Sequence, residues 1–220
     1  MGFLRTSMPA AAAPPATKRR QASEARRRAI LDAAFDIFIA EGFKAARLDD
    51  IAKSAGVAKG TLYLFFKDKE DLFEQVALDM VAPVLERLTH LAGQTDLPFA
   101  ALLTGMFALF EREVLGTKRR EIFRLIIAEG ARFPTIAEFY HREVISRGMA
   151  LIGGAAERAH ARGEISSDAL ARYPQLLFGP LLVSVVWRGL FEPYQPLDVA
   201  GMLAAHRDML LANAPKANEP

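Results

Sequence analysis

The segment that most constrains the fold of this chain is LDDIAKSAGVAKGTLYLFFKDKEDLF, residues 48–73. Apolar residues occur at helical spacing on both sides of Ala55-Gly56-Val57, where Gly56 can take the left-handed conformation that ends a helix. The segment therefore predicts two short helices that meet at a tight turn, followed directly by a third helix. Such a helix-turn-helix offers one helix to the major groove of DNA.

The second helix of this hairpin, about residues 58–65, has the side chains expected to face DNA. Lys59 can reach guanine acceptors or a phosphate, Thr61 can contact a base edge, and the Tyr63 hydroxyl can reach a phosphate. Gly60 lets the backbone approach the DNA closely, and Asp68 is predicted to cap the helix that follows. A hairpin that packs only against its own protein remains an alternative, which the basic outer face disfavours.

The run from Arg28 to Phe73 resembles the DNA-binding domain of the TetR/AcrR family of bacterial transcriptional regulators. The matching elements are AILDAAFDIFIAEGF at 29–43, DDIAKSAGV at 49–57 and KGTLYLFFKDKEDLF at 59–73. The resemblance implies operator contacts by Thr61, Tyr63 and residues 58–60, and a phosphate contact by Lys69. With the charged Arg47 and the outward Leu64, the candidate DNA-binding residues are Arg47, Ala58, Lys59, Gly60, Thr61, Tyr63, Leu64 and Lys69.

Two positions depart from the pattern of that family. Ala46-Arg47 stands where the family usually has Thr-Thr or Thr-Ser, and Ala58 stands where it often has Ser or Thr. Both departures remove hydroxyl groups that could bond phosphates, although the charge of Arg47 can substitute. They put individual contacts in question and leave the domain assignment unchanged.

Composition and charge agree with a nucleic-acid-binding helical protein. Apolar residues make up 51% of the chain with few strand-like alternations, which predicts an all-α fold. Residues 1–67 contain 12 basic and 6 acidic residues, whereas residues 68–220 contain 16 and 20. A basic N-terminal part on a mildly acidic body is typical of a DNA-binding domain attached to a second domain. The chain has no cysteine, which excludes disulfides and is compatible with the reducing cytoplasm, the expected location.

The first 23 residues are rich in Ala and Pro and are expected to form a disordered tail. Within them, Lys18, Arg19 and Arg20 could contact phosphates or the minor groove as a flexible arm, or they could be a solvated charge run without a partner. The tail lacks the pattern of a secretory signal. The most apolar run, Leu176–Trp187, is shorter than the ~20 residues that cross a bilayer, so no membrane contact is expected.

The domain organisation follows from helix starts and stops. The first helix should run over about 24–41 and end at Gly42, and residues 24–73 should form the three-helix DNA-binding domain. A long helix from Lys69 to near Gly93, kinked at Pro83, should connect it to a helical domain over 74–213, with residues 214–220 as a tail. Helices are expected at about 99–115, 118–132, 135–162, 168–191 (interrupted at Pro174 and at Gly179-Pro180) and 198–213, which gives about nine helices in the chain.

The resemblance implies that the second domain binds a small molecule and forms a homodimer. Aromatic, Met and polar residues on its predicted helices could line an apolar cavity. These candidate ligand-binding residues are Met106, Phe107, Phe110, Phe123, Ile127, Glu129, Phe139, Tyr140, Glu143, Val183 and Trp187, together with Ile126, Arg132 and Met149. The alternative is that the aromatic and Met residues are ordinary core.

A homodimer also has a physical basis, because two-fold related recognition helices read DNA half-sites about 34–36 Å apart. The helix from Pro174 to Leu190 and the last helix are predicted to form a four-helix interface. The candidate interface residues are Leu177, Leu181, Ser184, Val185, Arg188, Met202, His206, Met209 and Leu210. The alternatives are an intramolecular core for the first helix and a covering amphipathic helix for the last.

No motif for catalysis or metal binding accompanies the hairpin. The four histidines show no ligand spacing such as HExxH, and the chain contains neither a Gly-rich phosphate loop nor a GxSxG elbow. No enzymatic activity, cofactor or metal is therefore expected. Two functions remain: a repressor that a small effector releases from a palindromic operator, and a DNA-bound architectural or partner-recruiting protein without an effector. A cavity of several hundred Å³ among the aromatic residues would favour the first.

Overall fold

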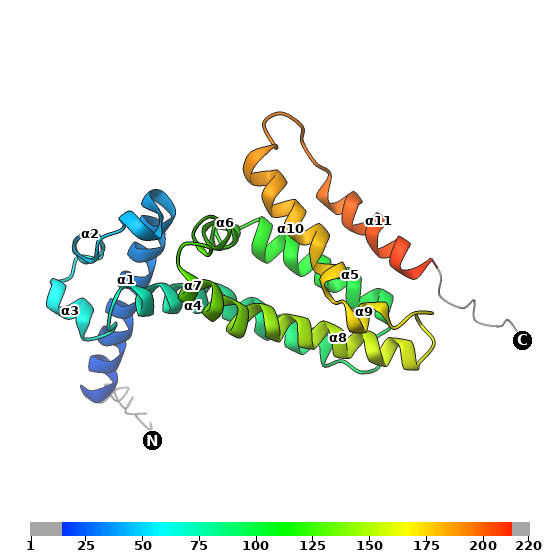
Figure 1. The fold of residues 1–220 in the computed structure, drawn as a ribbon. Helices are drawn as coiled ribbons and strands as arrows, with labels where there is room; N and C mark the ends of the chain where they lie inside the picture. The colour runs from blue at the N-terminus through cyan, green and yellow to red at the C-terminus, as the bar shows by residue number, and fades with distance from the viewer. Residues whose placement is uncertain (1–14, 213–220) are drawn as a thin grey trace, which may run out of the picture.

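The computed structural model describes residues 15–212, and every regular element within that range is a helix. Four helices contain the predicted hairpin and its connection to the rest of the chain (Figure 1). They are α1 (Pro15–Ala45), α2 (Leu48–Ser54), α3 (Lys59–Tyr63) and α4 (Lys69–Ala92). In Figure 1, α1 to α3 form one end of the molecule, and α4 extends from them into the second domain.

The second domain is a bundle of helices packed along α4 (Figure 1). Two π-helical turns extend its helices without a break: η1 continues α5, and η2 connects α7 to α8. The elements are α5 (Phe99–Phe110), η1 (Glu111–Leu115), α6 (Arg120–Glu129), α7 (Pro134–Tyr140), η2 (His141–Ile145), α8 (Ser146–Ala161), α9 (Ala169–Arg172), α10 (Gln175–Leu190) and α11 (Val199–Leu211). The predicted all-α, two-part architecture is confirmed.

The start of α1 differs from the prediction. The helix begins at Pro15 rather than at about residue 24, so residues 15–23 are helical and do not belong to a tail. Gly42 interrupts the helix as expected, because its φ of 80° lies in the left-handed region that glycine tolerates. The first 14 residues of the expected N-terminal tail and the expected C-terminal tail lie outside the described residues.

Two prolines lie inside helices. Pro83 is within α4, and Pro180 is within α10, which runs through the predicted Gly179-Pro180 interruption and begins just after Pro174. The hydroxyl of Ser184 donates a hydrogen bond of 2.8 Å to the Pro180 carbonyl one turn earlier. The predicted break at Gly179-Pro180 is therefore wrong, whereas the break at Pro174 is confirmed.

The apolar core consists of two clusters. The first cluster joins α1, the hairpin and the N-terminal half of α4 to α6, α7 and η2, and its centre is a set of aromatic rings. Phe43 packs edge-on against Phe73 at 5.4 Å and against Phe133 at 4.8 Å between ring centroids. We call this cluster the junction core, because Phe133 and its neighbours bring the second domain onto the end of α1. The second cluster lies within the second domain, among α5, α8, α10 and α11.

Over residues 15–212, none of the helices combines the length and the apolar character that a membrane span needs.

Candidate nucleic-acid interface and pockets of the second domain

The hairpin is held by a few apolar side chains and one left-handed glycine. Ile51, Ala52 and Leu62 are buried, with Ile51 and Leu62 fully excluded from solvent. Gly56 has a φ of 68°, and this turn brings the Val57 amide within 3.0 Å of the Ala52 carbonyl that it bonds. These residues fix the angle between α2 and α3, and with it the face that α3 presents to solvent.

The outer face of α3 is exposed as the motif predicts. Leu64, just past the helix, is 82% exposed and Tyr63 is 48% exposed. Lys59 and Gly60 are exposed, and Thr61 is partly buried. Ala58 and Arg47 are also exposed, and they are the residues before α3 and α2, where neither side chain makes a capping hydrogen bond. The structure thus places seven of the eight predicted DNA-binding residues on one hairpin.

Lys59 forms an ion pair with Asp49 of α2. Its Nζ lies 2.7 Å from Asp49 Oδ1, and both side chains are about half exposed. The hydrogen bond to Asp49 raises the pKa of Lys59 above its usual value, with the charge of Asp49 adding to it. The lysine is therefore a cation at neutral pH, and a DNA phosphate or guanine would compete with Asp49 for it.

Lys69 has a structural role in this state of the protein. Its Nζ donates hydrogen bonds of 3.1 Å to the carbonyls of Lys44 and Ala46, and it lies 4.8 Å from the centroid of the Phe43 ring. These contacts tie the start of α4 to the end of α1. The start of α4 is capped as predicted, since Asp68 Oδ1 accepts a 2.7 Å bond from the Asp71 amide. A phosphate contact by Lys69 stays a prediction. It requires the Lys69 ammonium group to donate to the phosphate in addition to, or instead of, the carbonyls of Lys44 and Ala46.

The predicted ligand-binding residues do not surround one cavity. Met106, Phe107 and Phe110 are buried in the second cluster, which Phe123 borders, whereas Phe139 and Tyr140 belong to the junction core. Ile127 and Val183 are exposed, and Trp187 is half-buried with its indole NH donating a hydrogen bond to the Gln195 carbonyl. Glu143 is held in ion pairs with Arg142 and Arg147. Helical spacing in the sequence predicts which side of a helix these residues lie on. It cannot show which of the two clusters each residue joins.

Two of the predicted residues do have unusual environments. Glu129 Oε2 and the Tyr140 hydroxyl are buried and have no hydrogen-bond partner among the described residues. Burial raises the pKa of Tyr140 well above its usual range, so the phenol is neutral. The other carboxylate oxygen of Glu129, Oε1, lies close to the Gly42 turn. A Cβ atom at position 42 would lie only 2.9 Å from this oxygen, so a side chain there would crowd Glu129. Buried polar groups normally have hydrogen-bond partners. A polar molecule that reached these two groups could therefore form hydrogen bonds with them.

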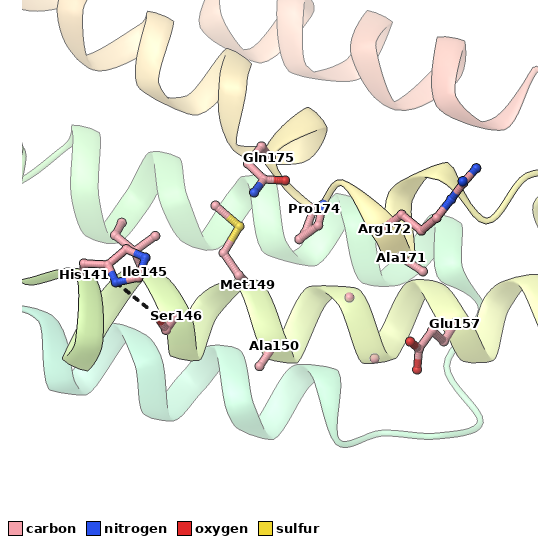
Figure 2. Close-up of a pocket in the computed structure, with 12 residues that line it drawn as sticks. His141, Ile145, Ser146, Met149, Ala150, Glu157, Ala171, Arg172, Pro174 and Gln175 are labelled. Atoms are coloured by element: carbon pink, nitrogen blue, oxygen red, sulfur yellow. Dashed lines mark hydrogen bonds between the residues drawn. The ribbon is translucent and has the colours of Figure 1, made fainter.

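A groove lies elsewhere, between α8 and the α9–α10 segment (Figure 2), and we call it the α8 groove. It has a volume of about 590 Å³, within the range of small-molecule sites. Met149 extends from α8 toward Gln175 at the start of α10, and Glu157 and Arg172 lie at one end. Its lining is His141, Ile145, Ser146, Met149, Ala150, Gly153, Gly154, Glu157, Ala171, Arg172, Pro174 and Gln175. Of these, sequence reasoning identifies only Met149, although the adjacent glycines on a long helix signal a face without bulky side chains.

One π-helical turn, η2, borders both the α8 groove and the junction core. His141 and Ile145 line the groove, and the His141 Nδ1 lies 3.5 Å from the Ser146 hydroxyl (Figure 2). Tyr140 and Val144, on the opposite side of the same stretch, are buried in the junction core. Single π turns inside α-helices occur frequently at functional sites. A molecule in the groove would thus contact the segment whose other face packs against the DNA-binding domain.

Four of the five predicted dimer residues of α10 are wrong. Leu177, Leu181, Ser184 and Val185 are buried inside the protomer, with Leu177 fully excluded from solvent, so they cannot contact a second copy. Arg188 is exposed and points a guanidinium nitrogen to the Leu115 carbonyl at 3.5 Å. The exposed apolar residues of α10 are instead Leu176, Leu182, Val183 and Leu190, and the first three are each next to a predicted residue. The physical reason is that α10 is apolar on nearly all sides, so the face with the clearest period is the one that packs inward.

The predicted residues of α11 lie closer to the surface. Met209 is exposed and His206 is half-buried, with its Nε2 3.0 Å from the Leu176 carbonyl. Met202 and Leu210 are half-buried against the second cluster. An apolar hollow of about 320 Å³ lies between α10 and α11, and we call it the α10–α11 face. Its lining is Pro180, Val183, Met202, Ala205, His206 and Met209.

Comparison with known proteins agrees with both parts of the structure. The family model for the bacterial regulatory proteins of the tetR family matches residues 30–76, and the model for a tetracyclin repressor-like C-terminal domain matches residues 93–200. The repressor BepR of Brucella suis is 30% identical over 158 residues, which cover 68% of this chain and 74% of BepR. The regulator AcrR of Shigella flexneri is 43% identical over 112 residues, which cover 50% of this chain and 52% of AcrR.

The chain spans about half or less of the length of AcrR and of most other curated relatives that it matches. Among solved structures, FadR from Bacillus subtilis in complex with stearoyl-CoA superposes with a TM-score of 0.63 at 21% identity, covering 84% of this chain and 98% of that one. Two family models along the chain, a relative matched over most of its length and the same helical fold lead to one conclusion: this chain belongs to the TetR family of helix-turn-helix transcriptional regulators.

Proposed function

We propose that this protein is a homodimeric repressor that binds a palindromic operator through α3 and releases it when a small, largely apolar effector occupies the α8 groove. The observation that supports effector control is the position of η2, which borders the groove on one side and the junction core on the other. The junction core also contains the buried side chains that hold the hairpin, including Phe73 and Ile51.

The operator-binding part of the proposal rests on the outer face of α3. One exposed lysine, one threonine and one tyrosine on a five-residue helix can make only a few contacts. Two copies related by a two-fold axis would double these contacts and would read two half-sites one helical turn apart. We assign the dimer interface to the α10–α11 face, because Val183 and Met209 expose apolar surface there that a second copy would cover.

The effector part of the proposal rests on the chemistry of the α8 groove. Ile145, Met149 and Pro174 offer apolar contacts, and Ser146 and Gln175 offer hydrogen bonds at the sides. An effector with an apolar body and a few polar groups fits this lining. FadR from B. subtilis, which has the same fold, was solved with stearoyl-CoA, a molecule with a long apolar chain. Occupation of the groove that shifts η2 would change the packing of α4, and operator DNA would reciprocally weaken effector binding.

The first experiment is to select operator fragments from random DNA with the full-length protein and to titrate the best fragment by fluorescence anisotropy. A palindromic site bound by a dimer supports the repressor, and binding that ignores sequence contradicts it. A panel of fatty acids, acyl-CoA thioesters and aromatic compounds is then tested for release of the fragment. Ala150→Phe places a ring in the groove and should abolish release by an active compound while operator affinity is kept. Ala161→Phe, on the exposed part of the same helix outside the groove, is the matched control.

A second candidate function is a DNA-bound architectural or partner-recruiting protein without an effector. The burial of Met106, Phe107 and Phe110 in a packed cluster favours it, because these side chains line neither the α8 groove nor the hollow between α10 and α11. If no compound of the panel releases the operator and Ala150→Phe behaves as the wild type does, this second function replaces the first.

A further inference from the structure

The first turns of α1 project beyond the body of the protein. All residues from Lys18 to Ala22 are exposed, on every side of the helix, whereas Ile30, three turns later, is fully buried. A helix segment that packs against nothing gains no stability from burial. Its side chains are therefore available to a partner outside the protomer.

This segment is strongly basic. Residues 15–28 contain six basic residues and one acidic residue, Glu24. Among the residues that the structure describes, Arg20 pairs with Glu24 at 3.3 Å and Arg28 pairs with Asp32 and Asp79. Lys18, Arg19 and Arg26 are exposed and make no ion pair within the described range. We call residues 18–20 together with Arg26 the basic end of α1.

The basic end of α1 has a fixed direction, because the next turn is attached to α4. Arg27 Nη2 donates a 2.8 Å hydrogen bond to Gln75 Oε1, and Arg28 Nη1 lies 3.0 Å from Asp79 Oδ1. Both acceptors are on α4, whose N-terminal half packs in the junction core. A rigid helical extension loses less conformational entropy on binding than a flexible arm does.

The extension also lies on the side of the recognition helix. The Arg27 guanidinium is 5.8 Å from the centroid of the Phe66 ring, and Phe66 follows Tyr63 of α3 by three residues. With a rise of 1.5 Å per residue, Arg19 lies about 12 Å further along α1. In Figure 1, α3 and the start of α1 are both at the end of the molecule that is distant from α8 to α11.

We propose that the basic end of α1 is a second DNA-binding element, which holds the phosphate backbone that flanks each half-site independently of its sequence. The chemistry is that of Lys and Arg side chains on phosphate oxygens, which adds affinity and salt dependence without base discrimination. The inference rests on the proposed operator binding, and it assigns the footprint of each protomer two separate parts. One part is the half-site in contact with α3, and the other is backbone about four base pairs away, at 3.4 Å per base pair.

The test compares wild-type protein with the triple variant Lys18→Gln/Arg19→Gln/Arg20→Gln. Glutamine keeps helix propensity and removes charge. The matched control is Arg87→Gln/Arg112→Gln/Arg147→Gln, which removes three exposed charges from the second domain outside the α8 groove. Anisotropy titrations use the selected operator at several salt concentrations. The slope of log K against log salt should become shallower by about 0.9 for each phosphate that the variant no longer neutralises, thus by up to about three per protomer. The control slope should be unchanged.

A second arm uses the length of the DNA. Removing about five base pairs from each end of the operator should weaken the wild-type protein and leave the triple variant almost unaffected, because the variant no longer binds the flanks. The ranking of operators with altered half-site bases should be the same for both proteins. An unchanged slope in the triple variant, or an equal reduction in affinity on shortening, overturns the second element. Absence of sequence-specific binding by the wild type overturns the proposed repressor instead, so the two failures are distinguishable.

Discussion

α3 and α10 both expose side chains at the surface of the protomer, but polarity is distributed around them in opposite ways. In α3 a single buried residue, Leu62, faces the core, and lysine, threonine and tyrosine occupy the remaining sides. In α10 leucines and valines occur all round, with Leu177 buried and Val183 47% exposed. A helix with one apolar stripe has a defined inner face, whereas a helix that is apolar on all sides does not.

The difference in polarity determines which kind of partner each surface suits. The exposed side chains of α3 are polar, so DNA adds contacts without competing with the core. The exposed side chains of α10 are as apolar as its buried ones, so a second copy would extend the core outward across the α10–α11 face. Substitutions on the inner and outer sides of each helix test whether the two surfaces differ in this way.

The largest effect is expected inside α3. Leu62→Ala should lower the free energy of unfolding by roughly 2–5 kcal/mol, because it removes a fully buried side chain from the hairpin. Leu64→Ala, at an exposed position two residues later, should change it by less than about 0.5 kcal/mol. Urea denaturation followed by circular dichroism measures both. Equal costs for the two substitutions would mean that α3 has no distinct inner face.

The next effect is expected on the outer side of α10. Val183→Asp should weaken dimerisation by about 2 kcal/mol or more, the size expected for a central interface position, and leave the protomer folded. Analytical ultracentrifugation gives the dimer dissociation constant, and circular dichroism reports the helix content. Leu182→Asp, a neighbouring exposed position outside the lining of the α10–α11 face, is the control. An intact Val183→Asp dimer would remove the interface from this face.

A smaller effect is expected on the outer side of α3. Lys59→Ala should weaken operator binding by roughly 1–3 kcal/mol and relax preference at one base position if the lysine contacts guanine. Tyr63→Phe should cost less, because it removes only a hydroxyl contact to a phosphate. Asp49→Asn keeps Lys59 and removes its competing partner, so it should bind the operator at least as well as the wild type. Anisotropy titration measures all three, and unchanged affinity in the first two would withdraw the DNA contacts assigned to α3.

The smallest effect is expected in the junction core. The Tyr140 hydroxyl is buried without a partner among the described residues, so Tyr140→Phe should leave the stability unchanged or raise it by up to about 1 kcal/mol. A thermal melt of both proteins tests this. A clear decrease in stability would mean that the hydroxyl has a hydrogen-bond partner in solution.

The hairpin is predictable residue by residue because its signals are local. A left-handed glycine, an aspartate cap and one apolar stripe each specify their geometry within a few residues, and the structure confirms Gly56, Asp68 and Leu62 in these places. The fold class follows from composition and from helix stops such as Gly42 and Gly116. These signals require no knowledge of which distant helices meet.

The pockets and the inner face of α10 are not predictable in this way, because they depend on contacts between distant segments. The α8 groove exists where Gly153 and Gly154 of α8 face Ala171 and Pro174, which a periodic pattern cannot bring together. The start of α1 escapes prediction for a different reason: the Pro14-Pro15 pair suggests a break, whereas Pro15 suits the first turn of a helix. Lys69 has a recognisable motif position, but its bonds to the carbonyls of α1 require the folded junction.

The junction core has a consequence for how the molecule melts and how it can be recombined. Ile122 and Ile136 of the second domain are buried in the same cluster as Phe38 and Phe73 of the DNA-binding domain. Residues 15–73 alone would therefore expose the apolar surface that α6 and α7 cover, and they are expected to unfold together with those helices in one cooperative transition. A chimera that exchanges DNA-binding domains by cutting at residue 73 divides a core rather than a linker, so the exchanged unit has to include the matching faces of α6 and α7.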